Sequence, residues 1–132
     1  METKMIWANL AATNLERTRK FYNSLGFRSN DNMSSGEIAS FTFAKNGFII
    51  NFFTPSRVED DTNGFIGKWK DQSEVLFSLQ ADSKEQLNEW REKVHLAGGE
   101  IISEPQPYEQ GYTFCFADQD GHKFNVLYWP GM

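Results

Sequence analysis

The chain has 132 residues, 39% of them hydrophobic and 23% charged, which is typical of one globular domain with a sizeable core. Its net charge of −5 and the lack of a Lys/Arg cluster argue against binding to nucleic acid. No stretch approaches the roughly 20 apolar residues of a membrane span, and no apolar leader follows Met1, so we expect a cytoplasmic protein without a membrane partner.

The first half of the chain predicts one helix and four strands. Asn14 is a good N-cap, apolar residues then recur at helical spacing, and Gly26 suits a left-handed helix end. Asn46 and Gly47 predict a tight turn between the last two strands. The expected strands are residues 5–11, a short segment from 27, 38–44 and 48–53.

The second half repeats this order after a polar linker, residues 55–73, in which a short helical turn is one option near residues 67–70. Ser83 is the N-cap of a second helix that ends at Gly98. Pro105 and Pro107 are expected to end a short strand, so that the residues around 104–110 form a loop. The expected strands are residues 75–81, 100–103, 111–117 and 122–129.

The chain therefore contains the order βαβββ twice. The two modules cover about residues 1–54 and 74–132. A half-chain repeat of this kind predicts two modules that share one sheet system within a single domain over residues 1–132. The expected fold class is α+β.

Two segments make the chain similar to the glyoxalase, bleomycin-resistance and extradiol-dioxygenase superfamily, also called vicinal oxygen chelate proteins. Asn14-Leu-Glu-Arg-Thr-Arg-Lys-Phe-Tyr-Asn-Ser-Leu-Gly-Phe27 resembles the family's strand-to-helix entry, and Asp118-Gln-Asp-Gly-His-Lys-Phe-Asn125 resembles its final hairpin. The resemblance covers nearly the whole chain and implies an incompletely closed, U-shaped mixed β-sheet with a cleft. Because the superfamily includes lyases, dioxygenases, isomerases, thiol transferases and drug-binding proteins, the resemblance does not name a reaction.

The resemblance also implies four metal-ligand positions, on the first and last strand of each module. Family enzymes mostly place His, Glu or Gln there, whereas these positions fall here on Trp7, Asn51, Leu76 and Asn125. Trp and Leu cannot ligate a divalent metal, and neutral Asn amides are weak ligands. We therefore expect no metal and no other cofactor. The alternative is one divalent metal ion held by ligands that lie elsewhere.

Strand alternation predicts, independently of the resemblance, which side chains line the cleft. Alternate apolar residues, including Ile6 and Val75, should face the core, and the residues between them should face the cleft. Amides and aromatic rings dominate this uncharged set, which suits a small neutral or aromatic organic molecule. The surplus of aromatic residues, 15% of the chain, fits either such a pocket or a Phe-rich β core. The predicted ligand-binding residues are Trp7, Asn9, Asn51, Phe53, Leu76, Ser78, Gln80, Asn125 and Leu127.

Few residues are candidates for catalysis, and the catalytic residues stay unassigned. His122 shares the alternation of core residues, and His95 should face solvent on the second helix. Cys115 is the only cysteine, which excludes an internal disulfide, and it should be a small buried hydrophobic residue rather than a nucleophile. Glu109 is the one acid expected near the cleft, where a solvated loop carboxylate is the simpler interpretation.

Three functions stay open at this point. The first is a metal-free member that binds a small organic molecule, for resistance by sequestration or for sensing. The second is a metal-dependent glyoxalase-like lyase or dioxygenase with displaced ligands, so the sequence does not decide whether the protein is an enzyme. The third is an inert interaction module whose own side chains fill the cleft. The resemblance implies a homodimer, with the cleft either inside one subunit or shared by two.

Overall fold

The structure, a computed structural model, describes residues 1–30, 35–62 and 75–131. The chain divides into two compact units, Met1–Gly67 and Lys68–Met132. The elements of the first unit are β1 (Ala8–Ala11), α1 (Leu15–Ser24), β2 (Arg28–Ser29), β3 (Ile38–Thr42), β4 (Ile49–Phe53) and α2 (Pro55–Asp61). Those of the second are β5 (Leu76–Gln80), α3 (Lys84–Leu96), β6 (Glu100–Tyr108), β7 (Gly111–Ala117) and β8 (Lys123–Tyr128).

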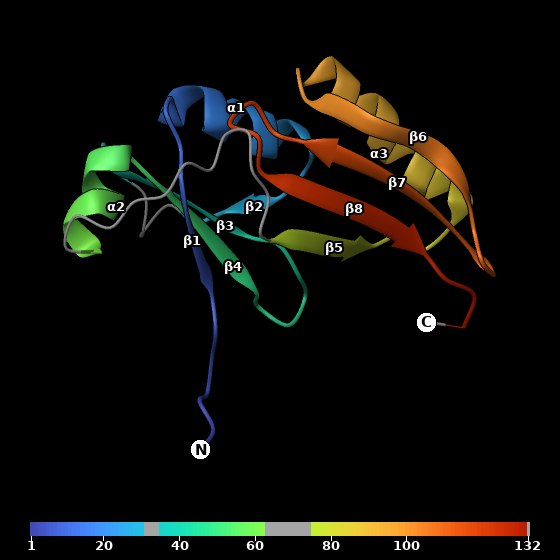
Figure 1. The fold of residues 1–132 in the computed structure, drawn as a ribbon, viewed down its shortest axis with the longest axis horizontal. Coiled ribbons are helices and arrows are strands. Elements are labelled where there is room, and N and C mark those ends of the chain that lie inside the picture. The colour runs from blue at the N-terminus through green and yellow to red at the C-terminus, as the bar shows by residue number, and fades with distance from the viewer. Residues whose placement is uncertain (31–34, 63–74, 132) are drawn as a thin grey trace. The chain divides into compact units, whose positions relative to one another are not determined.

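Each unit builds one four-stranded mixed sheet in the same way. The strand order is β1-β4-β3-β2 in the first unit and β5-β8-β7-β6 in the second, as Figure 1 shows for each. The first strand pairs parallel with the last one, and the other neighbours pair antiparallel. The α+β class and the repeated βαβββ order are thus confirmed. That the two sheets together line one U-shaped cleft stays a prediction.

The two long helices begin at the predicted caps. The side chain of Asn14 accepts a hydrogen bond from the Arg17 backbone N–H at 3.0 Å, and that of Ser83 accepts one from Gln86 at the same distance. Each cap satisfies a backbone donor that the first helical turn leaves unpaired. At the other ends, Gly26 has a φ of 92° and Gly98 a φ of 89°, which glycine adopts without strain.

The core of the first unit lies between α1 and one face of its sheet. Tyr22 is fully buried, with its ring centroid 4.7 Å from that of Phe52 on β4 and 5.7 Å from that of Phe41 on β3. Phe21 and Ile50 are buried beside them. Because alternate residues of a strand face opposite sides, Asn51 and Phe53 lie on the face away from α1.

The second unit repeats this packing with α3. Leu87 and Val94 of α3 are fully buried, and the helix contacts β6, β7 and β8. The rings of Phe116 and Phe124 stack with centroids 5.2 Å apart, and Phe114 is buried next to Phe116. Many of the aromatic residues therefore form two Phe-rich cores, which is the simpler of the two sequence interpretations.

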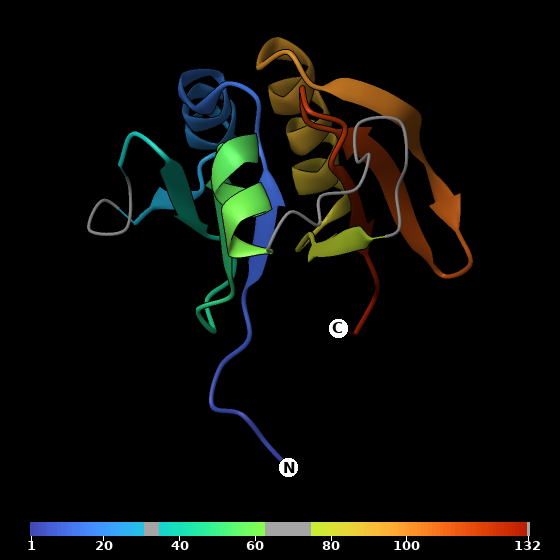
Figure 2. The ribbon, with the colours of Figure 1, turned by 60° about the vertical axis from the view of Figure 1, so that its left-hand side comes forward.

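The structure corrects two predictions about segment boundaries. Residues 104–110 were expected to form a loop, but β6 continues through Pro105 and Pro107 to Tyr108, where a two-residue turn leads into β7. The prolines are tolerated because β6 is an edge strand, whose outer side needs no donors, and because its register shifts before Gln106. In the expected linker, residues 55–61 form α2, which runs beside β1 (Figure 2). The helical turn suggested near residues 67–70 lies outside the described residues.

The predicted orientation of Ile6 and Val75 toward the core is also wrong. Both side chains are exposed, because they precede β1 and β5 and are not held in either sheet. His95 is exposed on α3, as predicted. Within the described residues, no helix is long and apolar enough to cross a membrane.

Candidate functional site

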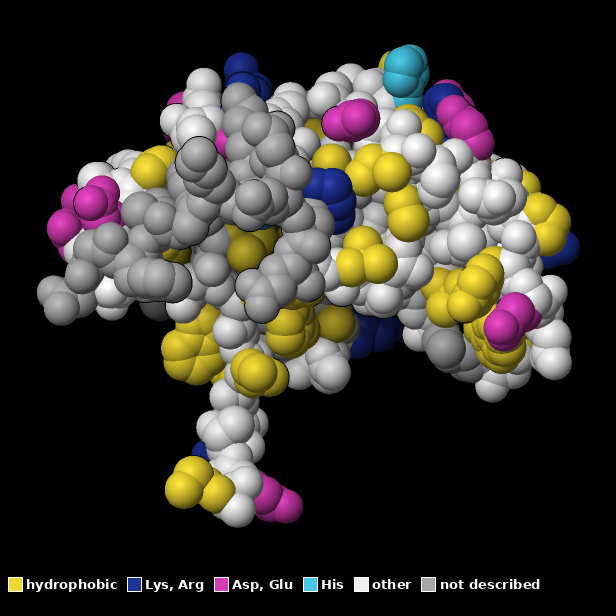
Figure 3. Space-filling view, viewed as in Figure 1, with side chains coloured by type: hydrophobic (Ala, Val, Ile, Leu, Met, Phe, Trp, Pro, Cys, Tyr) yellow, Lys and Arg dark blue, Asp and Glu magenta, His cyan; other side chains and the backbone are white. Residues whose placement is uncertain are grey.

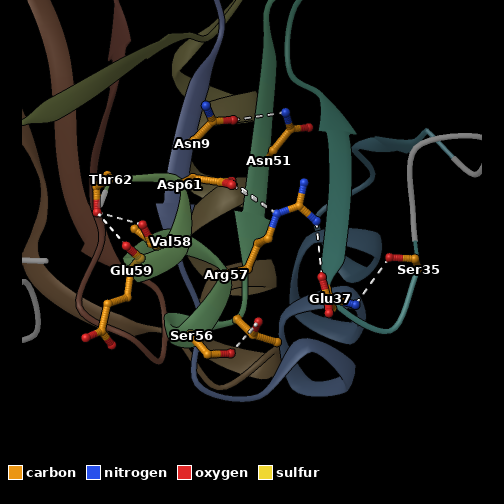
Figure 4. Close-up of polar contacts among 11 residues, drawn as sticks. Asn9, Ser35, Glu37, Asn51, Ser56, Arg57, Val58, Glu59, Asp61 and Thr62 are labelled. Carbon is orange, nitrogen blue, oxygen red and sulfur yellow. Dashed lines mark hydrogen bonds and ion pairs between the residues drawn. The ribbon is translucent and has the colours of Figure 1, made fainter. Parts of the chain in front are cut away.

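A line of polar side chains crosses the first sheet on the face away from α1. Asn9 on β1 is the register partner of Asn51 on β4, and Asn51 is the register partner of Ser40 on β3. The Asn51 Nδ2 donates to the Asn9 Oδ1 at 3.1 Å (Figure 4), and the Nδ2 of Asn30, next to β2, donates to the Ser40 Oγ at 3.1 Å. These four residues, Asn9, Asn51, Ser40 and Asn30, are called the first polar row.

Asn51 stands out in this row because its amide is buried but only half satisfied. The residue is 7% exposed, and its Oδ1 has no hydrogen-bond partner among the described residues. Its Nδ2 is used by Asn9. Buried polar atoms in folded proteins nearly always have a partner, so an acceptor left over at this position indicates a place for an incoming donor.

Arg57 of α2 lies over the same face of the sheet. Its Cζ is 5.2 Å from the ring centroid of Phe53, which follows Asn51 by two residues on β4 and therefore faces the same side. The Arg57 Nε donates to Asp61 at 3.1 Å, and the Nη1 donates to Glu37 at 3.1 Å (Figure 4). The hydrogen bond to Glu37, with the charge of Asp61, raises the pKa of Arg57, so this side chain is a fixed cation.

The second sheet carries an equivalent line on the face away from α3. Ser78 on β5 is the register partner of Asn125 on β8, which is the register partner of Cys115 on β7. The Ser78 Oγ donates to the Asn125 Oδ1, and the Cys115 backbone N–H donates to the Ser103 Oγ on β6 at 3.1 Å. These four residues, Ser78, Asn125, Cys115 and Ser103, are called the second polar row.

The structure brings some of the predicted ligand-binding residues together and leaves others apart. Asn9, Asn51 and Phe53 share one face of the first sheet. In the second unit, the register places Leu76, Ser78, Gln80, Asn125 and Leu127 on one face. Trp7 precedes β1 and is half exposed, and Leu76 at the start of β5 is also exposed. Whether all nine residues line one cleft stays a prediction.

Several residues of these faces were missed because their position depends on pairing between distant strands. Ser40, Asn30 and Ser103 belong to the polar rows but were given no role. Cys115 was expected to be buried, yet it is partly exposed because it alternates with the buried Phe114 and lies in the second polar row. Arg57 was missed because the segment that carries it was expected to be a linker.

The two acids within residues 104–110, the segment expected to be a loop, have other surroundings. Glu104 lies on β6 and pairs with Arg91 of α3, with 2.7 Å between the Glu104 Oε1 and the Arg91 Nη2. This hydrogen bond lowers the pKa of Glu104. Glu109 is exposed in the β6–β7 turn, where its φ is 51°. On the face drawn in Figure 3, the Lys and Arg side chains are scattered and form no patch.

The donor set of the polar rows does not fit a catalytic divalent metal. The rows contain amide, hydroxyl and thiol groups, with no imidazole and no carboxylate. Elsewhere in the described part of the chain, no group of three or more His, Cys, Asp or Glu side chains could hold a metal ion. Sites for catalytic metals of this kind usually take three His or carboxylate ligands.

Residues 4–126 match the family model described as the Glyoxalase/Bleomycin resistance protein/Dioxygenase superfamily. The chain belongs to this superfamily. The match covers nearly all of both βαβββ units and every residue of the two polar rows. No curated protein sequence matches the chain.

Several solved structures share this fold at low sequence identity. A hypothetical protein from S. aureus is 25% identical, with a TM-score of 0.83 over 97% of this chain and 95% of that one. A glyoxalase-related enzyme from Fulvimarina pelagi is 17% identical, with a TM-score of 0.84 over 97% and 90%. The fosfomycin resistance protein FosX from Mesorhizobium loti is 16% identical, with a TM-score of 0.70 over 97% and 93%.

Proposed function

We propose that this glyoxalase-superfamily protein binds a small neutral or aromatic organic molecule without a catalytic metal. It sequesters this molecule, as resistance-type binding proteins do. The single observation that carries the proposal is the composition of the two polar rows. Their side chains offer hydrogen-bond donors and acceptors without charge, next to aromatic and apolar groups such as Phe53 and Leu127. Such surfaces orient a neutral ligand through a few polar contacts and bind it through apolar area.

The main alternative is a metal-dependent lyase or dioxygenase of the same superfamily. That function needs a strong ligand set and a group that can move a proton. The polar rows consist of amides, hydroxyls and a thiol, and Arg57, which lies over the sheet of the first row, is charged and cannot act as a base near neutral pH. These observations favour binding over metal-dependent chemistry.

Elemental analysis distinguishes the two functions. Tag-free protein, purified without chelator, is dialysed against zinc, nickel, iron and manganese and then passed through gel filtration. We expect less than about a tenth of an equivalent of any metal, since the polar rows lack the ligand types that hold one. Near one equivalent retained through gel filtration would contradict the proposal and indicate a metalloenzyme.

A thermal-shift panel tests the binding itself. Ligands that bind only the folded state raise the melting temperature by mass action. We expect at least one neutral aromatic compound in a broad panel to raise it, with the same rise in the presence of EDTA. A panel without any effect would instead favour an inert interaction module.

A further inference from the structure

We infer that the first unit recognises the edge of a neutral cis amide, in which an N–H donor lies beside a C=O acceptor, as in a lactam, a pyridone or a uracil ring. The inference rests on the proposed function, because it names the class of molecule that the first polar row binds. One unsatisfied acceptor and one unused donor carry it, and both lie on the same face of one sheet.

The acceptor is the Oδ1 of Asn51. This atom is buried and has no partner among the described residues, while the Nδ2 of the same amide is held by Asn9. A water molecule can satisfy such an atom in the ligand-free protein, but a ligand that displaces the water without a donor leaves a buried carbonyl oxygen unpaired. Asn51 therefore selects for a ligand N–H or O–H.

The donor is the Nη2 of Arg57. The Nε and Nη1 of this guanidinium are taken by Asp61 and Glu37, and no described residue accepts a hydrogen bond from Nη2. The packing of Arg57 over Phe53 holds the guanidinium above β4. Figure 4 shows the remaining nitrogen of Arg57 on the side of Asn51. Because its other two donor groups are anchored, Arg57 presents this N–H in a fixed direction.

Charge decides which acceptor suits Arg57. The guanidinium already has two carboxylate partners, Glu37 and Asp61, so the local charge of this group is negative. A third carboxylate, or a phosphate, would be repelled by both acids, whereas a neutral carbonyl is not. A ketone uses only Arg57. A hydroxyl offers its donor and its acceptor on one oxygen atom, whereas an amide edge offers them on two neighbouring groups, the N–H for Asn51 and the C=O for Arg57.

The second polar row has no equivalent pair of groups. Its Asn125 Oδ1 already accepts from the Ser78 Oγ, and neither Arg57 nor α2 has a counterpart between β8 and the end of the described chain. We therefore assign recognition of the amide edge to the first unit alone.

The test is a titration of the full chain with three probes, monitored by ¹H–¹⁵N correlation spectra. The probes are 2-pyridone, N-methyl-2-pyridone, which lacks the N–H, and benzoate, which is an anion. We expect 2-pyridone to shift the side-chain amide signals of Asn9 and Asn51. It should bind about tenfold more tightly than either of the other probes, because only it satisfies both groups without adding charge.

Two variants and two matched controls identify the groups. Arg57→Met keeps the apolar stem and removes the donor, and Asn51→Leu removes the acceptor; each should weaken 2-pyridone binding about tenfold. Arg91→Met is the matched control for Arg57, since Arg91 also pairs with two carboxylates but lies on α3. Asn88→Leu is the matched control for Asn51, since Asn88 is exposed on α3 and belongs to neither polar row. Dispersed spectra establish that each variant is folded.

The outcomes separate this inference from the proposed function. Equal binding of 2-pyridone and its N-methyl form, or an unchanged affinity in both folded variants, would overturn the amide assignment while binding of a small molecule stands. Failure of 2-pyridone to bind overturns the assignment as well. Failure of every compound in the wider thermal-shift panel would overturn the proposed function too.

Discussion

Asn51 and Asn125 occupy equivalent positions in the two units and show how strand partners set the chemistry of one residue type. Both lie on the last strand of their sheet and face away from the helix. The partner of Asn125 is Ser78, whose hydroxyl satisfies the amide oxygen. The partner of Asn51 is another amide, Asn9, which takes the Asn51 N–H and leaves its oxygen unused. The asparagine side-chain oxygen therefore has a hydrogen-bond donor in the second unit and lacks one in the first.

Alternation within a strand was enough to place both Asn residues on the correct face. It could not reveal their partners, because parallel pairing joins residues 42 positions apart in the first unit and 47 apart in the second. The orphaned Asn51 oxygen and the position of Arg57 above Phe53 depend on such pairing. The sequence thus placed these two side chains on one face of their strands but could not predict their contacts.

The pair of Arg91 and Glu104 gives a pH prediction at the same scale. The hydrogen bond to Arg91 lowers the pKa of Glu104 in the folded protein. The pair therefore stabilises the folded protein at pH values above 4.5, the ordinary pKa of a glutamate side chain. That contribution is lost as the pH falls below 4.5 and through the folded pKa. We expect Glu104→Gln to lower the melting temperature slightly at pH 7, and the difference from the unmodified protein to vanish at strongly acidic pH.

Calorimetry over this pH range measures the effect. Glu89→Gln on α3 is the control for the loss of one negative charge, because Glu89 forms no ion pair within the described residues. A difference for Glu104→Gln that persists unchanged in acid would mean that the side chain stabilises the protein by packing and not by its charge.

At the scale of elements, the helices were the most predictable part of the fold because their signals are local. Asn14, Gly26, Ser83 and Gly98 lie within a few residues of the helix ends that they define. The length of β6 was not predictable in this way, because a proline is accepted on an edge strand and rejected in a central one. Only the assembled sheet shows that β6 is an edge.

The caps give a prediction at this scale. Asn14→Ala and Ser83→Ala should each lower the free energy of unfolding by about 1 kcal/mol, because each leaves a backbone N–H of the first turn without its acceptor. Asn14→Asp and Ser83→Asp keep an acceptor oxygen and should stay close to the unmodified protein. Urea denaturation followed by circular dichroism measures all four. An Asp variant as unstable as its Ala counterpart would contradict the capping role.

At the scale of the whole molecule, the repeat could be recognised in the sequence because both units have the same architecture. Each buries a Phe-rich sheet face under one helix and leaves a polar row on the other face. The units differ where function is expected. The first has α2 with Arg57 above its polar row, and the second has the long β6–β7 hairpin. The sequence predicted the repeat but not this asymmetry, since α2 falls in the segment between the modules.

We propose that the protein is a homodimer, as its resemblance to resistance-type relatives implies. Each unit has two large apolar side chains near the start of an edge strand, Ile6 and Trp7 before β1 and Val75 and Leu76 at β5, and all four are at least half exposed. Exposed large apolar side chains commonly mark a protein interface, and each unit has one adjacent pair of them.

Size-exclusion chromatography with light scattering should therefore give twice the chain mass of 15.2 kDa. The double variant Trp7→Glu, Leu76→Glu should shift the protein to the monomer mass, because a charge in an apolar interface loses its hydration without gaining a partner. Leu96→Glu is the matched control, since Leu96 is an exposed apolar residue at the end of α3 and belongs to neither β1 nor β5. A mass of 15.2 kDa for the unmodified protein would contradict the dimer, and a dimer that survives the double variant would place its interface on another surface.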